Sequence, residues 1–520
     1  MAFTTNDYQQ YRMTDSFNYL RERTQKFVEN SWAKGFAEII FPAINEERFS
    51  VLYSNNQATR PNSPVNVTVG ALILKEMLSL TDDELLASMV CDVRFQYALH
   101  TTSFDEQPVS DRTFSRFRQR LYDYAISTGV DLVKEEMESM AEAFVDFAKL
   151  NRTMRRMDSA MISSNCRKMS RLEIIYTCVA NMVKAMHRTG EEELLAGLLH
   201  YLDEDDKNNT IYRTKEEETS RFLNQVICDA AKLLCESGDA LFELPEYQLL
   251  KRVFAEQARI DEDGNYLPKD KKEIAPDSLQ NASDSDATYR RKAGKDHKGY
   301  VGNLEETFDE KGSIITAYDY QPNNYSDSKF CKDTIGRMGK QEESVTLIAD
   351  GAYGGSENVA IAMENNINLV TTALLGKDPN KAQAGFEINE TTHTITKCPG
   401  GYAAVKNCYY PKTGMYRCTF DKAICKHCLY KNECGIKFQK KSSVVLITVK
   451  TVDRAKYLKK LSTEEYRLLG RMRNGVEGLM SILRRKYNVD HMPVRGLVRS
   501  KIWFGFKIGA INAKKVMAMA

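Results

Sequence analysis

The chain has 520 residues, of which 42% are apolar and 28% charged, proportions that are ordinary for a folded globular protein. At about 150 residues per domain, this length predicts three or four domains. No apolar run approaches the roughly 20 residues that cross a bilayer, and Met1 to Asp15 lacks the apolar core of a signal peptide. We therefore expect a cytoplasmic protein without a membrane partner, whose twelve cysteines are thiols or metal ligands.

The net charge of +2 indicates no partner by itself, but the charge is unevenly distributed. Between Tyr466 and Ala520, twelve Lys and Arg residues are opposed only by Glu477 and Asp490, which leaves a local net charge of +10. Such a segment is typical of a surface that binds a polyanion, although a solvated helical face has a similar composition.

Residues 1–150 are predicted to be mostly helical. Val65 to Leu78 is an apolar run that alternates at first, so its helix could begin nearer Val69. A capping box, Thr81 to Glu84, precedes the next helix, and Ser110 opens an arginine-rich one. Short helices that end in an arginine-rich helix suit a helix-turn-helix-like DNA reader, with a plain helical bundle as the alternative.

The remaining chain predicts an α/β protein with two insertions. A strand within 151–168 is followed by a helical insertion and linker over 169–286, of which 261–287 is linker-like. Residues 287–375 have the order β-β-α-β-α-β, 376–459 form a β-rich insertion with cysteines, and 460–520 are basic helices. The strands and helices expected in the α/β part are 300–308, 314–320, 326–338, 344–349, 357–365 and 368–373, with a further strand at 444–449.

Three carboxylates stand out against this layout. Asp158 follows Arg155-Arg156-Met157, and Asp350 ends a buried strand before Gly351. Each of these acids could instead be a simple turn former. Glu477 lies at helical spacing from Arg473 and Arg484, so the three share one helix face, although an intrahelical ion pair has the same spacing.

Acids placed in this way can hold two divalent metal ions against a phosphodiester. Mg²⁺ prefers carboxylate and water ligands, and two such ions activate the nucleophile and stabilise the leaving oxygen of an in-line displacement. Arginines beside the third acid can bind phosphate oxygens in a bidentate manner.

The three acids together resemble the DDE transposases of bacterial insertion sequences. The second acid of that family lies in Asp-Gly-x-Tyr, here Asp350 to Tyr353, and its third acid lies in Tyr-x2-Arg-x3-Glu-x6-Lys. Arg473, Glu477 and Arg484 match this signature with Arg in place of Lys, whereas Gly470 replaces the Tyr. Tyr466, one turn earlier, is a candidate substitute for that Tyr.

The resemblance implies an RNase H-like mixed sheet with catalytic, metal-binding Asp158, Asp350 and Glu477 and two Mg²⁺ or Mn²⁺ ions. It implies cleavage at the terminal inverted repeats and joining of the 3′-OH to target DNA, by a dimer on paired ends at the bacterial nucleoid. The expected DNA-binding residues are Arg473, Arg484, Tyr353, Arg485 and Lys486, and the basic run from Arg290 to Lys298 could also touch phosphates. The alternatives are a nuclease on the same core that does not join DNA, and a DNA-binding regulator without catalysis.

Six of the cysteines fall between residues 398 and 434. Cys425 and Cys428 have the Cys-x2-Cys spacing of a zinc knuckle, and with Cys398 and Cys434 they form a possible tetrahedral zinc site. Cys418 and His427 are substitutes in that set, and free thiols in a β-rich insertion are the alternative.

Overall fold

The computed structural model describes residues 1–6, 16–56, 58–101, 109–191, 195–292 and 294–520. Most of the polar N-terminal stretch and Ala293 of the basic run lie outside the described residues. Among the described helices, none combines the length and the apolar character needed to cross a bilayer.

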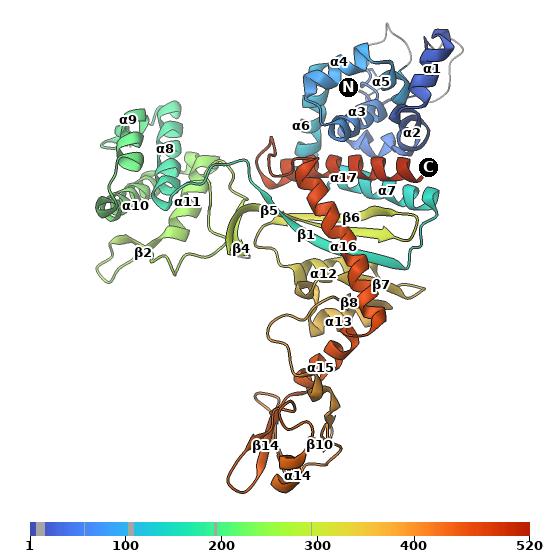
Figure 1. Ribbon diagram of the computed structural model, residues 1–520. Coiled ribbons are helices and arrows are strands. Elements are labelled where there is room, and N and C mark those ends of the chain that lie inside the picture. The colour runs from blue at the N-terminus through green and yellow to red at the C-terminus, as the bar shows by residue number, and fades with distance from the viewer. Residues whose placement is uncertain (7–15, 57, 102–108, 192–194, 293) are drawn as a thin grey trace.

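A mixed sheet lies at the centre of the molecule (Figure 1). Its main strands run in the order β6-β5-β1-β7-β8, and β4 pairs with the start of β5. β5 is antiparallel to β1 and β6, whereas β7 is parallel to β1 and β8. The strand bounds are β1 Met154–Ser163, β4 Thr288–Lys292, β5 Lys295–Phe308, β6 Ser313–Pro322, β7 Val345–Ala349 and β8 Ile367–Thr371. The α/β prediction is confirmed, and the mixed pairing agrees with the RNase H-like expectation.

Helices cover both faces of this sheet. On one face, α12 (Asp327–Met338) and α13 (Ser356–Glu364) bury a core that includes Met157 of β1. On the other, α7 (Leu132–Ala148) and α17 (Leu497–Met519) pack over β6, and Ile162 of β1 belongs to that core. Because side chains alternate along a strand, odd and even residues of β1 face different helices.

The N-terminal helices share the core of α7 and α17. α3 begins at Val65 rather than near Val69, because its first turn is buried on all sides and its apolar alternation therefore does not mark a strand. The capping box at Thr81 is confirmed, and so is the helix expected to start at Ser110, which is the N-cap of α6. The helices are α1 Glu22–Glu29, α2 Trp32–Gly35, α3 Val65–Leu78, α4 Asp82–Cys91, α5 Val93–Ala98 and α6 Asp111–Thr128, with 3₁₀ or π turns at Ser16–Tyr19, Phe36–Ile40, Phe41–Ala43 and Glu46–Leu52.

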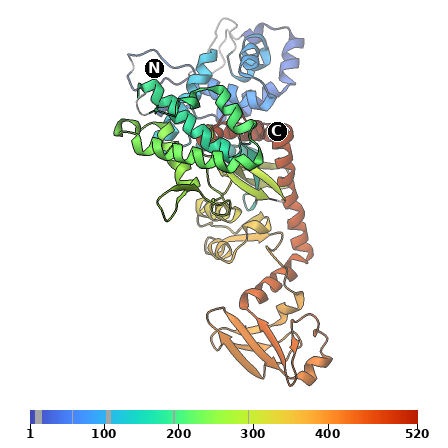
Figure 2. The ribbon, with the colours of Figure 1, turned by 90° about the vertical axis from the view of Figure 1, so that its left-hand side faces the viewer.

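The helical insertion has a core of its own and projects to one side of the sheet (Figures 1 and 2). The segment 261–287, predicted as a linker, consists largely of turns but also carries β3, which pairs with β2. The elements are α8 Arg171–Thr189, α9 Glu204–Lys207, α10 Thr219–Glu236, α11 Pro245–Gln257, β2 Ala258–Ile260 and β3 Tyr266–Pro268, with 3₁₀ or π turns at Leu199–Leu202, Asn208–Tyr212, Glu216–Glu218 and Asp239–Leu241.

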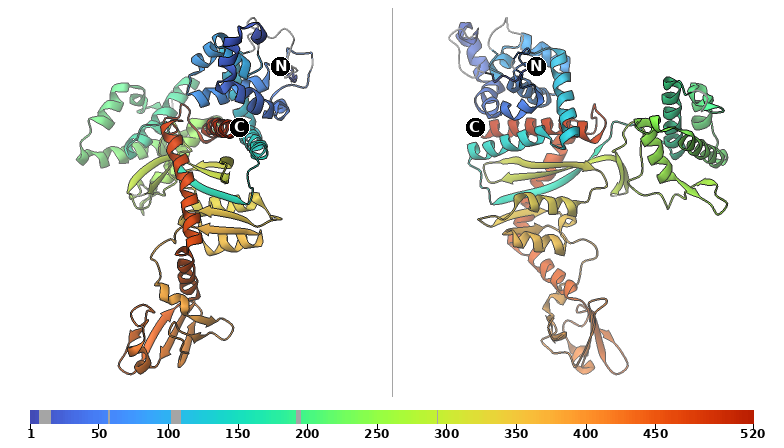
Figure 3. Two further views of the ribbon diagram at one scale, coloured as in Figure 1. Left: turned by 45° about the vertical axis from the view of Figure 1, so that its right-hand side comes forward. Right: turned by 180° about the vertical axis from the view of Figure 1, so that it is seen from behind.

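The cysteine-containing insertion also has its own core and lies at the end of the molecule opposite the N-terminal helices (Figure 3). Its elements are β9 Glu387–Asn389, β10 Thr394–Lys397, β11 Lys406–Tyr410, β12 Met415–Phe420, α14 Lys422–His427, β13 Lys437–Phe438 and β14 Ser443–Ile447, after a 3₁₀ turn at Lys381–Gly385. The strand expected at 444–449 ends earlier because Thr448 caps the next helix, α15 (Val449–Leu461). The 22-residue helix α16 (Glu464–Arg485) then runs back along the sheet.

Candidate active site

Asp158 and Asp350 lie level with each other on neighbouring strands. In the parallel pairing of β1 with β7, Arg156 is opposite Ile348, so Asp158, two residues further along, is level with Asp350. Strands spaced about 4.8 Å apart bring two such carboxylates within strong electrostatic reach. Burial raises the pKa of Asp158, and the charge of Asp350 raises it further, whereas Arg473 lowers it.

Each of these two carboxylates accepts a backbone hydrogen bond through one of its oxygens. Asp158 Oδ1 accepts the Ser159 N–H at 2.9 Å, and Asp350 Oδ1 accepts the Gly351 N–H at 2.7 Å. Asp158 lies inside β1 rather than at its end, while Asp350 follows β7 directly and begins a 3₁₀ turn. An added Cβ on Gly351 would lie 2.7 Å from the Ala373 carbonyl oxygen, so glycine permits this turn.

Helix α16 lies along the β1 face that carries Asp158. Arg156, two residues before Asp158 and therefore on the same face, donates from Nη1 to the Met472 carbonyl at 2.7 Å. At the other end of the contact, Arg484 Nη2 donates to the Met161 carbonyl at 3.1 Å. The helix passes so close that a Cβ on Gly475 would lie 2.0 Å from Arg156 Nη1. The predicted helix face therefore lies against β1, the strand that carries Asp158.

Arg473 joins the third acid to the first. Its Nη2 is 2.8 Å from Asp158 Oδ2, and its Nη1 is 2.6 Å from Glu477 Oε1. The Arg473 and Asp158 side chains are 13% and 15% exposed, whereas Glu477 is 55% exposed. Arg473 Nε is buried without a hydrogen-bond partner. A guanidinium cation thus lies between two of the three carboxylates.

The described residues contain no group of three or more His, Cys, Asp or Glu side chains that is already arranged to hold a metal ion. The chemistry of the acids nevertheless fits Mg²⁺ or Mn²⁺, because all three supply carboxylate oxygens. Arg473 shows that these carboxylates attract a cation, although a metal ion would compete with it for Asp158 and Glu477.

The residues expected to bind DNA have different surroundings. Arg484 is 47% exposed and lies 3.5 Å from Asp490, while Arg485 and Lys486 are exposed at the end of α16. Tyr353 is only 1% exposed, and its hydroxyl donates to Asn303 Oδ1 at 2.8 Å. Its ring packs in the core beside α12, so it is not accessible to DNA, and we withdraw it from the expected DNA contacts.

Arg156 and Asp327 had no role assigned from the sequence. The basic run from Arg290 to Lys298 was named, but not the residues of the protein that this run contacts. Arg156 precedes Asp158 in an alternating strand, but only the fold brings it to α16. Asp327 accepts the Ser159 hydroxyl at 2.8 Å and an Arg290 N–H at 3.2 Å, which anchors the basic run beside β1. Lys292 from this run acts electrostatically on Asp158. The charge of the basic run marked it in the sequence, whereas no feature of the sequence marked Arg156 as a functional candidate.

The residue that might replace the signature tyrosine, Tyr466, packs against Tyr457 with ring centroids 6.3 Å apart. Tyr457 in turn binds the backbone of Thr371 at the end of β8. Gly470 faces the same strand end, since its added Cβ would be 4.0 Å from Thr372. Tyr466 therefore lies near the sheet through Tyr457.

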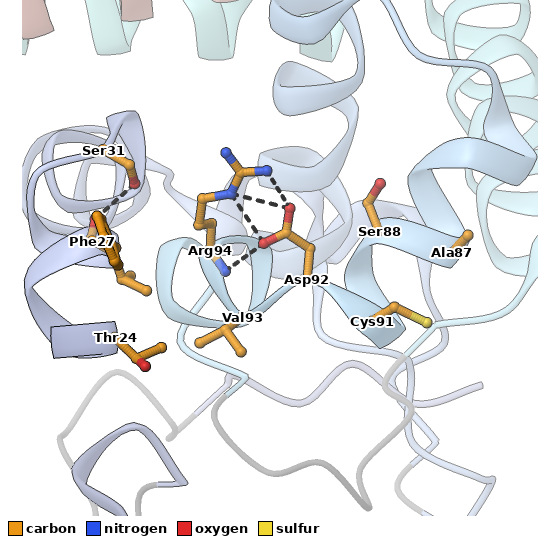
Figure 4. Close-up of a pocket in the computed structure, with 10 residues that line it drawn as sticks. Thr24, Phe27, Ser31, Ala87, Ser88, Cys91, Asp92, Val93 and Arg94 are labelled. Atoms are coloured by element: carbon orange, nitrogen blue, oxygen red, sulfur yellow. Dashed lines mark hydrogen bonds and ion pairs between the residues drawn. The ribbon is translucent and has the colours of Figure 1, made fainter. Parts of the chain in front are cut away.

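The cavities that lie away from the acids include two of contrasting size. An open groove of about 820 Å³ is bordered by α1, α4 and α5 (Figure 4). Its charged residues Asp92 and Arg94 pair with each other at 2.6 Å, so the groove presents no unpaired charge of its own. A much smaller cavity in the cysteine-containing insertion is lined by all four cysteines of the expected zinc set: Cys398, Cys425, Cys428 and Cys434.

Comparison with known families gives two matches. Residues 397–517, which include Glu477, match the family described as transposase DDE domain. Residues 22–120 match the family described as transposase domain (DUF772). No curated protein and no solved structure matches the chain. Two segments of the chain thus match transposase families, which agrees with its resemblance to the DDE transposases of insertion sequences.

Proposed function

We propose that the protein cleaves DNA at the ends of an insertion sequence and joins the freed 3′-OH to target DNA. Asp158, Asp350 and Glu477 would hold two Mg²⁺ or Mn²⁺ ions. When bound, such ions activate the attacking oxygen and stabilise the leaving oxygen in an in-line displacement at phosphorus. The observation that carries this proposal is the level placement of Asp158 and Asp350, with Glu477 brought to them through Arg473.

The chain's own residues would prepare this site in three ways. The hydrogen bonds at Asp158 Oδ1 and Asp350 Oδ1 orient both carboxylates, and Arg473 would have to release Asp158 Oδ2 for a metal ion to bind there. Arg473 balances the negative charge of the acids before metal and DNA bind. The exposed Arg485 and Lys486 would contact phosphates and position the backbone.

In this proposal water is the first nucleophile and the 3′-OH is the second. Hydrolysis breaks a P–O bond and leaves a 3′-OH and a 5′-phosphate. Strand transfer then breaks a P–O bond of the target as it forms a new one to the 3′-OH, so one phosphodiester replaces another without an external energy source. The partners are the terminal inverted repeats and the target DNA, and a dimer would hold two ends together. We expect this reaction in the bacterial cytoplasm, at the nucleoid.

The substitution Asp350→Asn tests the catalytic proposal. It keeps the shape of the side chain but removes a charge that should hold metal, so Mg²⁺-dependent cleavage should fall by at least about 1,000-fold, since a metal contributes several kcal/mol to the transition state. DNA binding, measured by gel shift, should persist. The exposed Asp378, in the loop after β8, provides a matched Asp378→Asn control that should cut normally. Undiminished cleavage by Asp350→Asn would refute the assignment.

Strand transfer distinguishes the proposal from its two rivals. Oligonucleotides with pre-cut 3′-OH ends should be joined to plasmid DNA by the wild-type protein in the presence of Mg²⁺ or Mn²⁺. A nuclease without strand transfer would cut intact ends but give no joined product. A regulator without catalysis would bind the ends and do neither, and its binding would be indifferent to all three acids.

A further inference from the structure

The β-rich insertion gathers four of its six cysteines around one small cavity. Cys398 follows β10, Cys425 lies in α14, and Cys428 and Cys434 lie in the loop that follows. All four line a cavity of about 20 Å³. The other two cysteines of the insertion do not: Cys408 is exposed on β11, and the Cys418 thiol donates to Asn407 Oδ1 at 3.1 Å.

The backbone turns around this cavity hold the cysteines in place. The Cys398 N–H donates to the Tyr402 carbonyl at 2.8 Å, and the Gly401 N–H donates to the Cys398 carbonyl at 2.7 Å. Gly401 has a φ of +87°, a conformation that favours glycine in so tight a turn. An added Cβ on Gly400 would lie 3.1 Å from Cys428 Sγ, so this turn packs directly against the Cys-x2-Cys segment.

The second turn has features of a thiolate site. The Cys428 N–H donates to the Cys425 carbonyl at 3.4 Å, which closes the segment between the two cysteines. The Ile436 N–H donates to the Cys434 sulfur, a contact that helps to orient this side chain. Two turns, one from each side, therefore present sulfur atoms to a common space.

Four thiols in one cavity need a reason. The thiol of Cys425 interacts electrostatically with those of Cys398, Cys434 and Cys428, so the four sulfurs lie near one another. A cavity of about 20 Å³ holds one water-sized occupant and excludes an organic ligand. Four sulfur ligands with a Cys-x2-Cys pair are the donor set of a closed, tetrahedral structural zinc site.

The insertion would gain stability from such an ion. Its hydrophobic core is small and separate from the other cores, and the cysteine-bearing segments 398–405 and 428–436 contain turns rather than strands or helices. A core of this size often needs a disulfide or a metal ion to hold its loops. All twelve cysteines are free, so no disulfide serves this purpose.

We propose that Cys398, Cys425, Cys428 and Cys434 bind one structural Zn²⁺ that holds the two turns of the insertion together. The described residues contain no ready-made group of metal ligands, so zinc binding requires the side chains of these cysteines to rearrange. Binding would release protons from the thiols, so zinc affinity should increase with pH. This site is separate from the carboxylate site and does not depend on the catalytic proposal.

The test is the metal content of the purified full-length protein, measured by plasma mass spectrometry after dialysis. We expect about one zinc per chain in the wild type and less than about a tenth of that in Cys425→Ser and Cys434→Ser. Cys408→Ser is the matched control, because Cys408 lies in the same insertion but outside the cavity, and it should retain zinc.

Cobalt substitution provides a second measurement that needs no variant. Protein prepared with Co²⁺ should show thiolate-to-metal charge transfer and the d–d absorption of a tetrahedral site. Wild-type protein without stoichiometric zinc and without this spectrum would overturn the proposal, as would equal zinc in the wild type and Cys425→Ser. A thiol titration that finds these cysteines oxidised to disulfides would also overturn it.

Discussion

The contact between Gly475 and Arg156 predicts that a single methyl group on α16 will disturb the active site. In Gly475→Ala the new Cβ would lie 2.0 Å from Arg156 Nη1, whereas carbon and nitrogen need at least about 3 Å. Arg156 has little freedom to move away. Its Nε is 2.7 Å from Glu306 Oε2, its Nη1 is 2.7 Å from the Met472 carbonyl, and its guanidinium lies 4.6 Å from the centre of the Phe308 ring.

The protein can respond to the Gly475→Ala clash in two ways, and each gives an expected size of the effect. If Arg156 swings away, the hydrogen bond to Met472 is lost, at about 1.5–3 kcal/mol for a charged donor, while alanine returns about 1 kcal/mol of helix propensity. The net cost is then about 1–2 kcal/mol. If Arg156 stays, α16 must move outward by about 1 Å, and Glu477 moves with it. A displacement of that size at a catalytic group can reduce the rate about 100-fold.

Urea unfolding and Mg²⁺-dependent cleavage of end DNA measure these two effects. Gly478→Ala is the matched control, because Gly478 lies on the same helix and its added Cβ has no atom within 4 Å. The control should cut normally and gain about 0.5–1 kcal/mol of stability. If Gly475→Ala matched Gly478→Ala in both stability and cleavage, the close contact between α16 and β1 would be refuted.

Two further predictions concern charges. Without DNA, Arg473→Ala should bind Mn²⁺ about tenfold more tightly than the wild type, because a competing cation is removed from the acids. Calorimetry measures this affinity, and Arg473→Lys should resemble the wild type. Equal affinity in all three proteins would contradict the counter-ion role of Arg473. The double variant Arg485→Ala, Lys486→Ala should reduce the slope of log K against log salt for DNA binding by about 1.8. The control is the double variant of the exposed Lys440 and Lys441 to Ala in the β-rich insertion, which should leave the slope unchanged if that insertion does not contact the same DNA. An unchanged slope in the first double variant would exclude phosphate contacts by Arg485 and Lys486.

Local features of the sequence predicted many elements of the fold. The capping box at Thr81 and the strands expected at 300–308 and 314–320 depend on residues within a few positions of each other, and the structure contains all three. The same holds for the helix face of Arg473, Glu477 and Arg484, which follows from helical spacing alone. Local spacing failed at Val65, because a helix buried on all sides has no polar face to mark its period.

The cysteines show how much of a site residue spacing alone can predict. It selected Cys425 and Cys428 as a pair and proposed Cys398 and Cys434 as their companions, but it kept Cys418 as a substitute. The folded insertion brings the first four to one cavity and directs the Cys418 thiol to Asn407. The contact between Cys418 and Asn407 depends on the pairing of β11 with β12, which the sequence does not specify.

The sequence by itself predicted the three candidate acids, the order of strands and helices, and the basic helix. Each of these features depends on residue type and on periodicity over a few neighbouring residues. Only the tertiary structure decided that Asp158 is level with Asp350, that Arg473 bridges Asp158 and Glu477, and that Tyr353 is buried. The first two join residues that are 192 and 315 positions apart in the chain. Contacts at such separation depend on strand register and helix docking, which are set by packing of the whole core rather than by neighbouring residues.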